Sequence, residues 1–177
     1  MKKRSLTVRY TALVGMMAAI IEGGKLAFAA LPNIEVVSLF VALFSYSFGW
    51  AGVLSAFVFV CIEPLIWGFG TWFVSYLIYW PALALLFLFL GKARVRNRFA
   101  ITAVIALSTF FFGILTSLVD VGLFSGSFDR FFYRFGIYYA RGIVFYAVHI
   151  VSNLLIFLFL FNPLRTLLKK IKSTVFK

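Results

Sequence analysis

Cysteine, acidic residues and charge in general are scarce in this chain of 177 residues. The single cysteine, Cys61, excludes an intrachain disulfide and any metal site built from several cysteines. Charged residues make up 12% of the sequence, against the roughly 25% that is average for soluble globular proteins. The sequence therefore has too little charge to cover the surface of a soluble domain.

Motifs for nucleotide hydrolysis and metal catalysis are also missing. There is no G-x-x-x-x-G-K-[ST] phosphate loop, no H-E-x-x-H zinc motif and no G-x-S-x-G nucleophile turn. Apolar runs fill nearly all of the chain, which leaves no room for a soluble catalytic domain. We therefore expect no enzymatic activity, no cofactor and no bound metal in the chain itself.

Hydrophobic residues, by contrast, make up 64% of the sequence, and the mean hydropathy is +1.06. A helix needs about 20 apolar residues to cross a bilayer. Four runs meet this length without ambiguity, at 10–30, 72–90, 101–124 and 137–161. The stretch 36–62 is either one long span or a hairpin that turns at Phe48-Gly49-Trp50-Ala51-Gly52.

The positions of Lys and Arg distinguish these two possibilities. A hairpin, with spans at 34–48 and 51–67, gives six spans and places the basic clusters 2–9, 92–98 and 165–177 on one side. Five spans would place two of these clusters outside, against the bias that keeps positive residues in the cytoplasm. We therefore predict an all-α integral membrane protein, a single domain over 1–177, built as a six-transmembrane-helix bundle with both termini cytoplasmic. The net charge of +12 then reflects orientation in the membrane rather than binding of nucleic acid.

The first apolar run also has features of a cleavable signal peptide. Lys2-Lys3-Arg4 precedes it, and Ala27-Phe28-Ala29 has the A-x-A pattern of a cleavage site. However, Glu22 and Lys25 lie where the apolar region of a signal peptide is uncharged. We therefore expect an uncleaved helix.

Charged residues within the predicted spans are few, and the acidic ones all fall toward the outer side. Inside a bilayer each costs roughly 2.5 to 3.5 kcal/mol on insertion scales, so they are expected to face the bundle interior. The residues concerned are Glu22, Lys25, Glu63, Asp120 and Arg141. Glu22 and Lys25 are i, i+3 neighbours, so they either neutralise each other or take part in ligand binding.

Polar and aromatic residues gather toward the outer ends of the later spans. The last span carries a row at i+4 spacing that is either a pocket wall or a set of interhelical hydrogen bonds: Arg141, Phe145, His149 and Asn153. Aromatic residues there either form an interfacial belt or stack on a ligand, among them Trp67, Trp72, Tyr76 and Tyr138.

Small residues recur at every fourth position of the first span: Thr11, Gly15, Ala19, Gly23 and Ala27. Such a ridge lets another helix approach closely, and that helix belongs either to this chain or to another protein. The basic segments 92–98 and 165–177 are typical of contact with anionic lipid.

With these features the whole chain resembles the substrate-binding S component of an energy-coupling factor (ECF) transporter. The resemblance rests on the length, on six spans with both ends inside, and on Gly15-x-x-x-Ala19, where that family has Ala-x-x-x-Ala. The turn Leu31-Pro32-Asn33-Ile34-Glu35 is also similar, as is Trp67-Gly-Phe-Gly-Thr-Trp72 running into Tyr79-Trp80-Pro81. Glycine in place of the first alanine departs from the family pattern but still suits close packing.

The resemblance implies a prokaryotic, multi-pass protein of the cell membrane that captures a vitamin or related micronutrient at the outer face. Its partners would be a transmembrane coupling protein and two cytoplasmic ATPase subunits, which drive uptake. Carried over by position, Pro32 to Glu35 would form a lid, and the ridge at Gly15, Ala19 and Gly23 would meet the coupling protein. The residues expected to bind substrate are Asn33, Glu35, Glu63, Trp67, Trp72, Tyr76, Asp120, Tyr138, Arg141 and His149.

A structural membrane protein is the alternative, for example one that resembles the cell-shape factor MreD, which is also small and multispanning. Such a protein would need no ligand, and its intramembrane charges would be structural pairs. Ligand-induced stabilisation distinguishes the two, because a compound that binds only the folded state raises its apparent stability.

Overall fold

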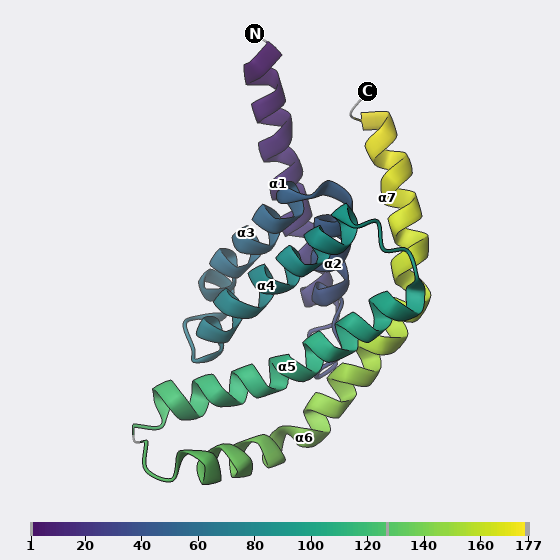
Figure 1. Cartoon of the computed structure of the whole chain (residues 1–177). Helices are drawn as coiled ribbons and strands as arrows, with labels where there is room; N and C mark the ends of the chain where they lie inside the picture. Colours follow the sequence, from purple (N-terminus) through teal and green to yellow (C-terminus); the bar gives the residue numbers. More distant parts are fainter. Residues whose placement is uncertain (1, 127, 176–177) are drawn as a thin grey trace.

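The computed structural model describes residues 2–126 and 128–175, with side chains described from 8 to 173 apart from 127. Within these residues every element is helical (Figure 1): α1 (Lys2–Ala27), α2 (Val37–Phe48), α3 (Trp50–Trp67), α4 (Trp72–Lys92), α5 (Arg98–Phe124), α6 (Phe131–Ile156), the π-helical η1 (Phe157–Phe161) and α7 (Asn162–Val175). The side chains of Lys2, Lys3 and Arg4 and the whole of Lys177, which belong to the basic clusters, lie outside the described residues.

Four helical segments are long and apolar enough to cross a membrane: α3, α4, α5 and the continuous helix Phe131–Ser173. The helix α2 is also apolar but shorter. By length and composition the chain is therefore a helical membrane protein. The helix α1, which carries Glu22 and Lys25, is not among the four, although it covers most of the predicted span 10–30.

The stretch 36–62 forms two helices that turn at Gly49. This residue has a φ of +67°, in the region that favours glycine, and its N–H donates to the Ser45 carbonyl at 3.0 Å. Gly52 packs so closely on α2 that a Cβ there would lie 2.3 Å from the Phe44 carbonyl carbon. Because α2 begins at Val37 rather than at the expected residue 34, Glu35 belongs to the α1–α2 loop.

The last helix runs further than expected, because it continues past residue 161 through η1 into α7. Side chains of α7 contact the end of α2. The Lys172 ammonium donates to the Ser47 carbonyl at 2.7 Å, and Arg165 donates to the Tyr46 hydroxyl at 3.4 Å. Two basic side chains of α7 thereby hold it against the last residues of α2, next to the turn at Gly49.

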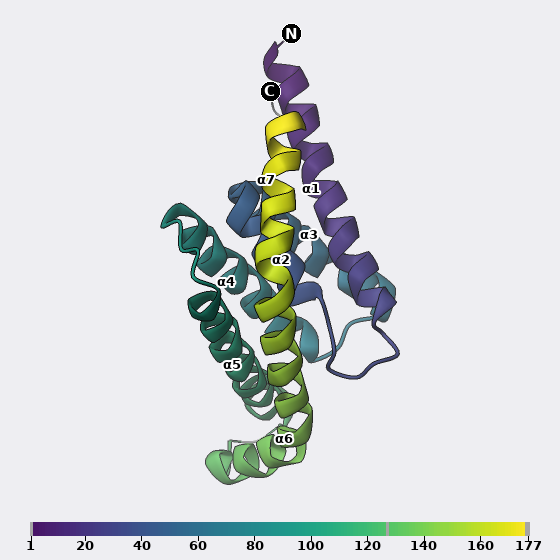
Figure 2. The same cartoon turned by 90° about the vertical axis from the view of Figure 1, so that its right-hand side faces the viewer.

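The buried core lies among α1 to α4, the beginning of α5 and η1. The helices α5 and α6 pack mainly on each other. The halves that are nearer the α5–α6 loop project from the core as an arm (Figures 1 and 2). Both termini lie at one end of the molecule, and the α1–α2, α3–α4 and α5–α6 loops lie toward the other (Figure 1). We call this second end the loop end.

The ridge of small residues on α1 faces away from the other helices. Gly15, Ala19 and Gly23 are exposed. Among the described residues, and leaving aside the adjacent backbone of α1 itself, no atom lies within 4 Å of the place that a Cβ would take at Gly15 or Gly23. At these three positions the ridge is therefore exposed rather than covered by another described helix of this chain.

Candidate functional site

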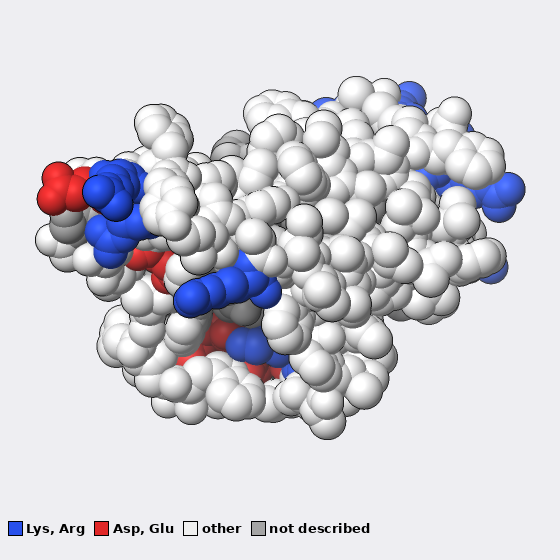
Figure 3. Space-filling model, turned by 90° about the horizontal axis from the view of Figure 1, so that it is seen from below, with Lys and Arg blue, Asp and Glu red and all other residues white. Residues whose placement is uncertain are grey.

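A cavity of about 220 Å³ opens at the loop end, between the α1–α2 loop and helices α4, α5 and α6. One wall is made of three aromatic rings that contact one another: Tyr76, Trp80 and Phe112. Four polar side chains also line it: Lys25, Asn33, Glu35 and His149. Seen from the loop end, acidic and basic side chains lie together inside a hollow (Figure 3). An apolar wall with a few convergent polar groups is typical of sites for small molecules.

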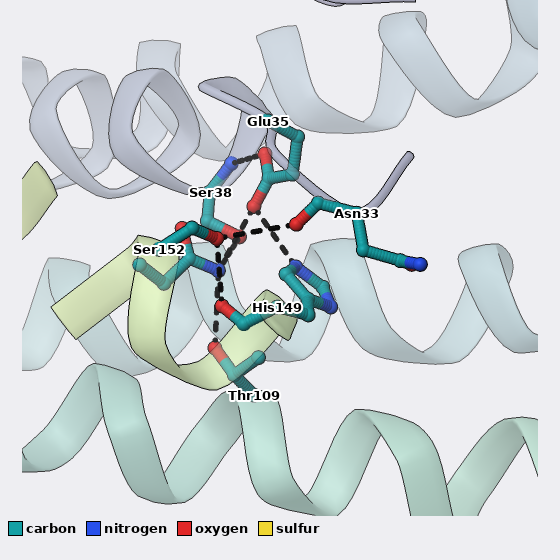
Figure 4. Close-up of polar contacts among 7 residues, drawn as sticks. Asn33, Glu35, Ser38, Thr109, His149 and Ser152 are labelled. Atoms are coloured by element: carbon teal, nitrogen blue, oxygen red, sulfur yellow. Dashed lines mark hydrogen bonds and ion pairs between the residues drawn. The ribbon is translucent and has the colours of Figure 1, made fainter. Parts of the chain in front are cut away.

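Glu35 fastens the α1–α2 loop both to α2 and to α6 (Figure 4). Its Oε2 accepts a hydrogen bond from the Ser38 backbone N–H at 2.8 Å, which satisfies one of the free amides at the start of α2. Its Oε1 lies 3.1 Å from His149 Nε2 and accepts from Asn153 Nδ2 at 2.9 Å. One carboxylate therefore connects the loop to two successive turns of α6.

The loop and α6 meet a second time at Asn33. The Ser152 hydroxyl donates to the Asn33 carbonyl at 3.1 Å, across 119 positions of sequence. Asn33 has a φ of 60°, a left-handed conformation that asparagine adopts more readily than most residues. Its side chain points away from Glu35 (Figure 4). These contacts hold the segment that contains the expected lid, Pro32 to Glu35, against the cavity.

His149 and Asn153 are the only buried residues of α6 within the described part of the chain, and both are polar. Asn153 Nδ2 also donates to the Thr109 hydroxyl of α5 at 3.2 Å. The His149 ring packs edge-on against Phe112, with 5.6 Å between the ring centroids. Hydrogen bonds at His149 and Asn153 thus join α6 to the α1–α2 loop and to α5. Such polar contacts are common between membrane helices.

The carboxyl group of Glu35 lies outside the helices, and its contacts favour the charged form. Burial raises its pKa, but hydrogen bonding and charge from His149, with hydrogen bonds from Ser38, outweigh burial and hold the pKa below its ordinary value of 4.5. Glu35 is therefore ionised at neutral pH and acts as an acceptor for the groups around it.

Lys25 forms a second polar cluster beside the cavity. Its ammonium pairs with Glu63 of α3 rather than with Glu22, so the local pair considered from the sequence is replaced by a contact between helices. Nζ lies 5.0, 6.0 and 5.5 Å from the centroids of three rings, those of Trp67, Trp72 and Tyr76. At these distances an aromatic face attracts a cation. We call the three rings the aromatic cage.

Asp120, Tyr138 and Arg141 lie apart from this cavity, on the parts of α5 and α6 that are nearer the α5–α6 loop. The Tyr138 hydroxyl donates to Asp120 Oδ2 at 2.9 Å. The three residues line a separate depression of about 420 Å³. A further depression of about 410 Å³ is lined by Tyr138, Arg141 and Asn33, and Asn33 also borders the first cavity.

The structure therefore divides the residues expected to bind substrate into three groups. Asn33, Glu35, Tyr76 and His149 line the first cavity; Glu63, Trp67 and Trp72 surround Lys25; Tyr138 and Arg141 line the two other depressions, one of them with Asp120. The row on α6 is divided as well, because His149 and Asn153 are buried whereas Arg141 and Phe145 are exposed.

Lys25, for which ligand binding was one of two alternatives, lines the cavity. Other residues of the site were not among those expected to bind substrate: Trp80 and Phe112 line the cavity, and Ser38, Thr109 and Ser152 complete the hydrogen bonds around Glu35 and Asn153. Trp80 follows Trp72 and Tyr76 at i+4 spacing, so helical periodicity would place it on the same face. Phe112 has no such signal, because it is one of 24 phenylalanines and lies in a run of three.

Comparison with known proteins gives no family assignment, since no protein-family model, curated protein or solved structure matches this chain. The function has to be inferred from the site itself. The cavity at the loop end is the feature that bears on it most directly.

Proposed function

We propose that the chain is the substrate-binding S component of an ECF-type importer, which captures a vitamin or related micronutrient at the outer face of a prokaryotic cell membrane. The observation that carries this proposal is the cavity at the loop end, which lies under a loop that Glu35 ties to α6. Its aromatic wall suits stacking on a solute, and its few polar groups suit orientation of that solute. No catalysis is assigned to the chain.

In this proposal α1 to α6 make six crossings, and both termini lie in the cytoplasm. The two termini lie at the same end of the molecule, as an even number of crossings requires (Figure 1). The clusters 92–98 and 165–177 then lie on the cytoplasmic side, in agreement with the bias of positive residues. The cavity at the opposite end opens to the outside.

The proposal needs partners for energy, because the chain has no phosphate-binding loop of its own. A transmembrane coupling protein and two cytoplasmic ATPases supply it. The exposed ridge at Gly15, Ala19 and Gly23 supports this part of the proposal, since small residues allow a partner helix to approach closely.

A thermal-shift screen of the purified protein tests the proposal, with vitamins, their precursors, nucleobases and amino acids as test compounds. We expect at least one compound to raise the Tm of the wild type, because it binds only the folded state. The same compound should act on Phe110→Ala, whose ring is 42% exposed, but not on Phe112→Ala, whose ring lines the cavity. If no compound raises the Tm, the transport proposal fails and a structural role like that of MreD takes its place.

A further inference from the structure

Arg141 is an exposed basic residue of α6 that lines both depressions, those of about 420 and 410 Å³. It makes no hydrogen bond or ion pair with any described residue. Lys25, which lines the cavity, pairs with Glu63. Arg134, which lines one depression, donates to the Ser125 carbonyl at 3.1 Å. Among the described Lys and Arg side chains that line the cavity and the two depressions, that of Arg141 is therefore left for a ligand.

The position of Arg141 makes an unpaired charge costly. It belongs to the helix Phe131–Ser173, which is long and apolar enough to cross a membrane. The ten residues from 131 to 141 correspond to about 15 Å along that helix. A charged side chain within a membrane helix marks a functional site by default. The planar guanidinium of arginine matches the geometry of carboxylate and phosphate groups, so an anion is the partner that suits it.

One of the two depressions places Arg141 next to the α1–α2 loop. Asn33 of that loop lines this depression, and no acidic residue does. Asn33 also lines the cavity, so the two hollows adjoin at this residue. Its side chain points away from Glu35 (Figure 4). An anion bound to Arg141 can therefore belong to a molecule that also enters the cavity.

The cavity suits a part of that molecule without negative charge. An anion inside it would be repelled by the Glu35 carboxylate, which is ionised at neutral pH. Lys25 does not offset this repulsion, because it is paired with Glu63. The cavity offers a flat apolar surface instead, made by Tyr76, Trp80 and Phe112. A ring therefore fits the cavity better than an anionic group does.

The two regions lie on one face of α6, at a definite separation. His149 lines the cavity and Arg141 the depression, and Phe145, which also lines the depression, lies between them at i+4 spacing. The eight residues from 141 to 149 correspond to about 12 Å along the helix. A solute that reaches both regions therefore has a chain between its ring and its charge.

We propose that the substrate carries a carboxylate or phosphate on a chain attached to a flat, uncharged ring. The anionic group binds Arg141 next to Asn33, and the ring packs against the aromatic wall of the cavity. This inference rests on the proposed function and names the class of substrate for the same end of the molecule. It also gives Arg141 the counter-charge that the described residues do not supply.

Three probes with the same terminal phenyl ring and the same chain test the inference: phenylhexanoate, phenylhexanol and phenylhexylammonium. Each is added at equal millimolar concentration and neutral pH to the protein purified in a non-ionic detergent. We expect phenylhexanoate to raise the Tm most. Arg141→Gln should weaken phenylhexanoate binding by about tenfold, the effect of one charge-assisted hydrogen bond, and leave phenylhexanol binding unchanged. Arg130→Gln removes the same charge at an exposed position outside the cavity and both depressions, so it should bind like the wild type.

Four results would overturn the inference: no shift with phenylhexanoate, an equal or larger shift with one of the other probes, equal losses in Arg130→Gln and Arg141→Gln, or unchanged phenylhexanoate binding in Arg141→Gln. Dihexanoyl phosphatidylglycerol, added separately, tests a lipid headgroup as the anion. If it raises the Tm of the wild type but not of Arg141→Gln, while phenylhexanoate has no effect, Arg141 binds lipid and the inference is wrong.

Failure here is distinguishable from failure of the proposed function. If a neutral or cationic compound from the wider screen raises the Tm of the wild type and of Arg141→Gln but not of Phe112→Ala, the importer proposal stands and only the anionic class is wrong. A screen without any binder removes both.

Discussion

At the scale of single residues, Glu35 connects the α1–α2 loop to both α2 and α6. An ionised carboxylate only accepts hydrogen bonds, and here both oxygens have donors, from Ser38 on one side and Asn153 on the other. His149 adds a third contact with Oε1. Since His149 and Asn153 are buried, loss of the carboxylate would leave both without the acceptor that they share.

Replacement of this carboxylate should therefore lower stability. We expect Glu35→Ala to reduce the free energy of unfolding by about 2 kcal/mol or more, because hydrogen bonds to charged groups contribute roughly 1.5 to 3 kcal/mol each. Thermal unfolding in detergent measures the change. The control Asp129→Asn, at an exposed position where contacts are screened by solvent, should lose less stability than Glu35→Ala. Equal losses in the two variants would show that the Glu35 contacts do not hold the loop.

The same contacts predict a dependence on pH with a definite sign. The pKa of Glu35 is lower in the folded state than its ordinary value of 4.5, so its contribution to stability is full above that value and is lost as the pH falls through the lowered pKa. The difference in Tm between the wild type and Glu35→Gln should therefore be largest above pH 4.5 and shrink as the solution is acidified further. A difference that grows on acidification would contradict the assignment.

Sequence reasoning identified Glu35 and His149 as site residues but not their contact with each other. The two residues are 114 positions apart, and no local periodicity relates them. The same holds for Lys25, whose neighbour Glu22 suggested a local pair, whereas the partner in the structure is Glu63, 38 positions away. Residue types at a site can be read from polarity within apolar runs, but their partners depend on how the helices pack.

At the scale of elements, the hairpin of α2 and α3 shows where sequence reasoning was sufficient. The cluster of glycines at 49 and 52 indicated a turn, and the structure places the turn at Gly49 and the close contact at Gly52. The sequence prediction placed the start of α2 at residue 34, three residues too early. Ile34 and Val36 belong to the loop but are as apolar as the residues of the helix that follows. Apolar character alone does not show where a helix begins.

The close contact at Gly52 allows a direct test of this packing. A Cβ at Gly52 would lie 2.3 Å from backbone atoms of Phe44 and Ser45, which cannot move aside easily. We expect Gly52→Ala to cost about 1 to 3 kcal/mol, as overpacking usually does. In Gly15→Ala the new methyl group meets nothing within 4 Å, so stability should be unchanged or slightly higher. Similar Tm values for the two variants would show that α2 and α3 do not pack as described.

The exposed ridge of α1 leads to a prediction about partners. Ala19→Leu adds bulk where the ridge is open, so the purified protein should keep its Tm and its ligand-induced shift. Energised uptake in cells should be lost, because a partner helix can no longer approach. Ala103→Leu makes the same change at an exposed site on α5 and should leave uptake intact. If uptake survives in Ala19→Leu, the ridge is not the docking surface.

At the scale of the whole molecule, the cavity lies at the edge of the tightly packed core, and Val37 and Trp80 belong to both. The core involves α1 to α4, the beginning of α5 and η1, and the cavity lies where α4 and the α5–α6 arm meet the α1–α2 loop. The arm is joined to the loop mainly by polar contacts of His149, Ser152 and Asn153. The separation of arm and core was not visible in the sequence, because both consist of apolar helices of similar length.

The most direct test of the central claim is hydrogen exchange of the backbone amides of residues 28–36, measured with and without a compound that raises the Tm. We expect the compound to slow exchange in this loop, because a solute in the cavity contacts the loop and reinforces its attachment to α6. A compound that stabilises the protein while exchange in residues 28–36 stays unchanged would contradict the claim that this cavity is the binding site.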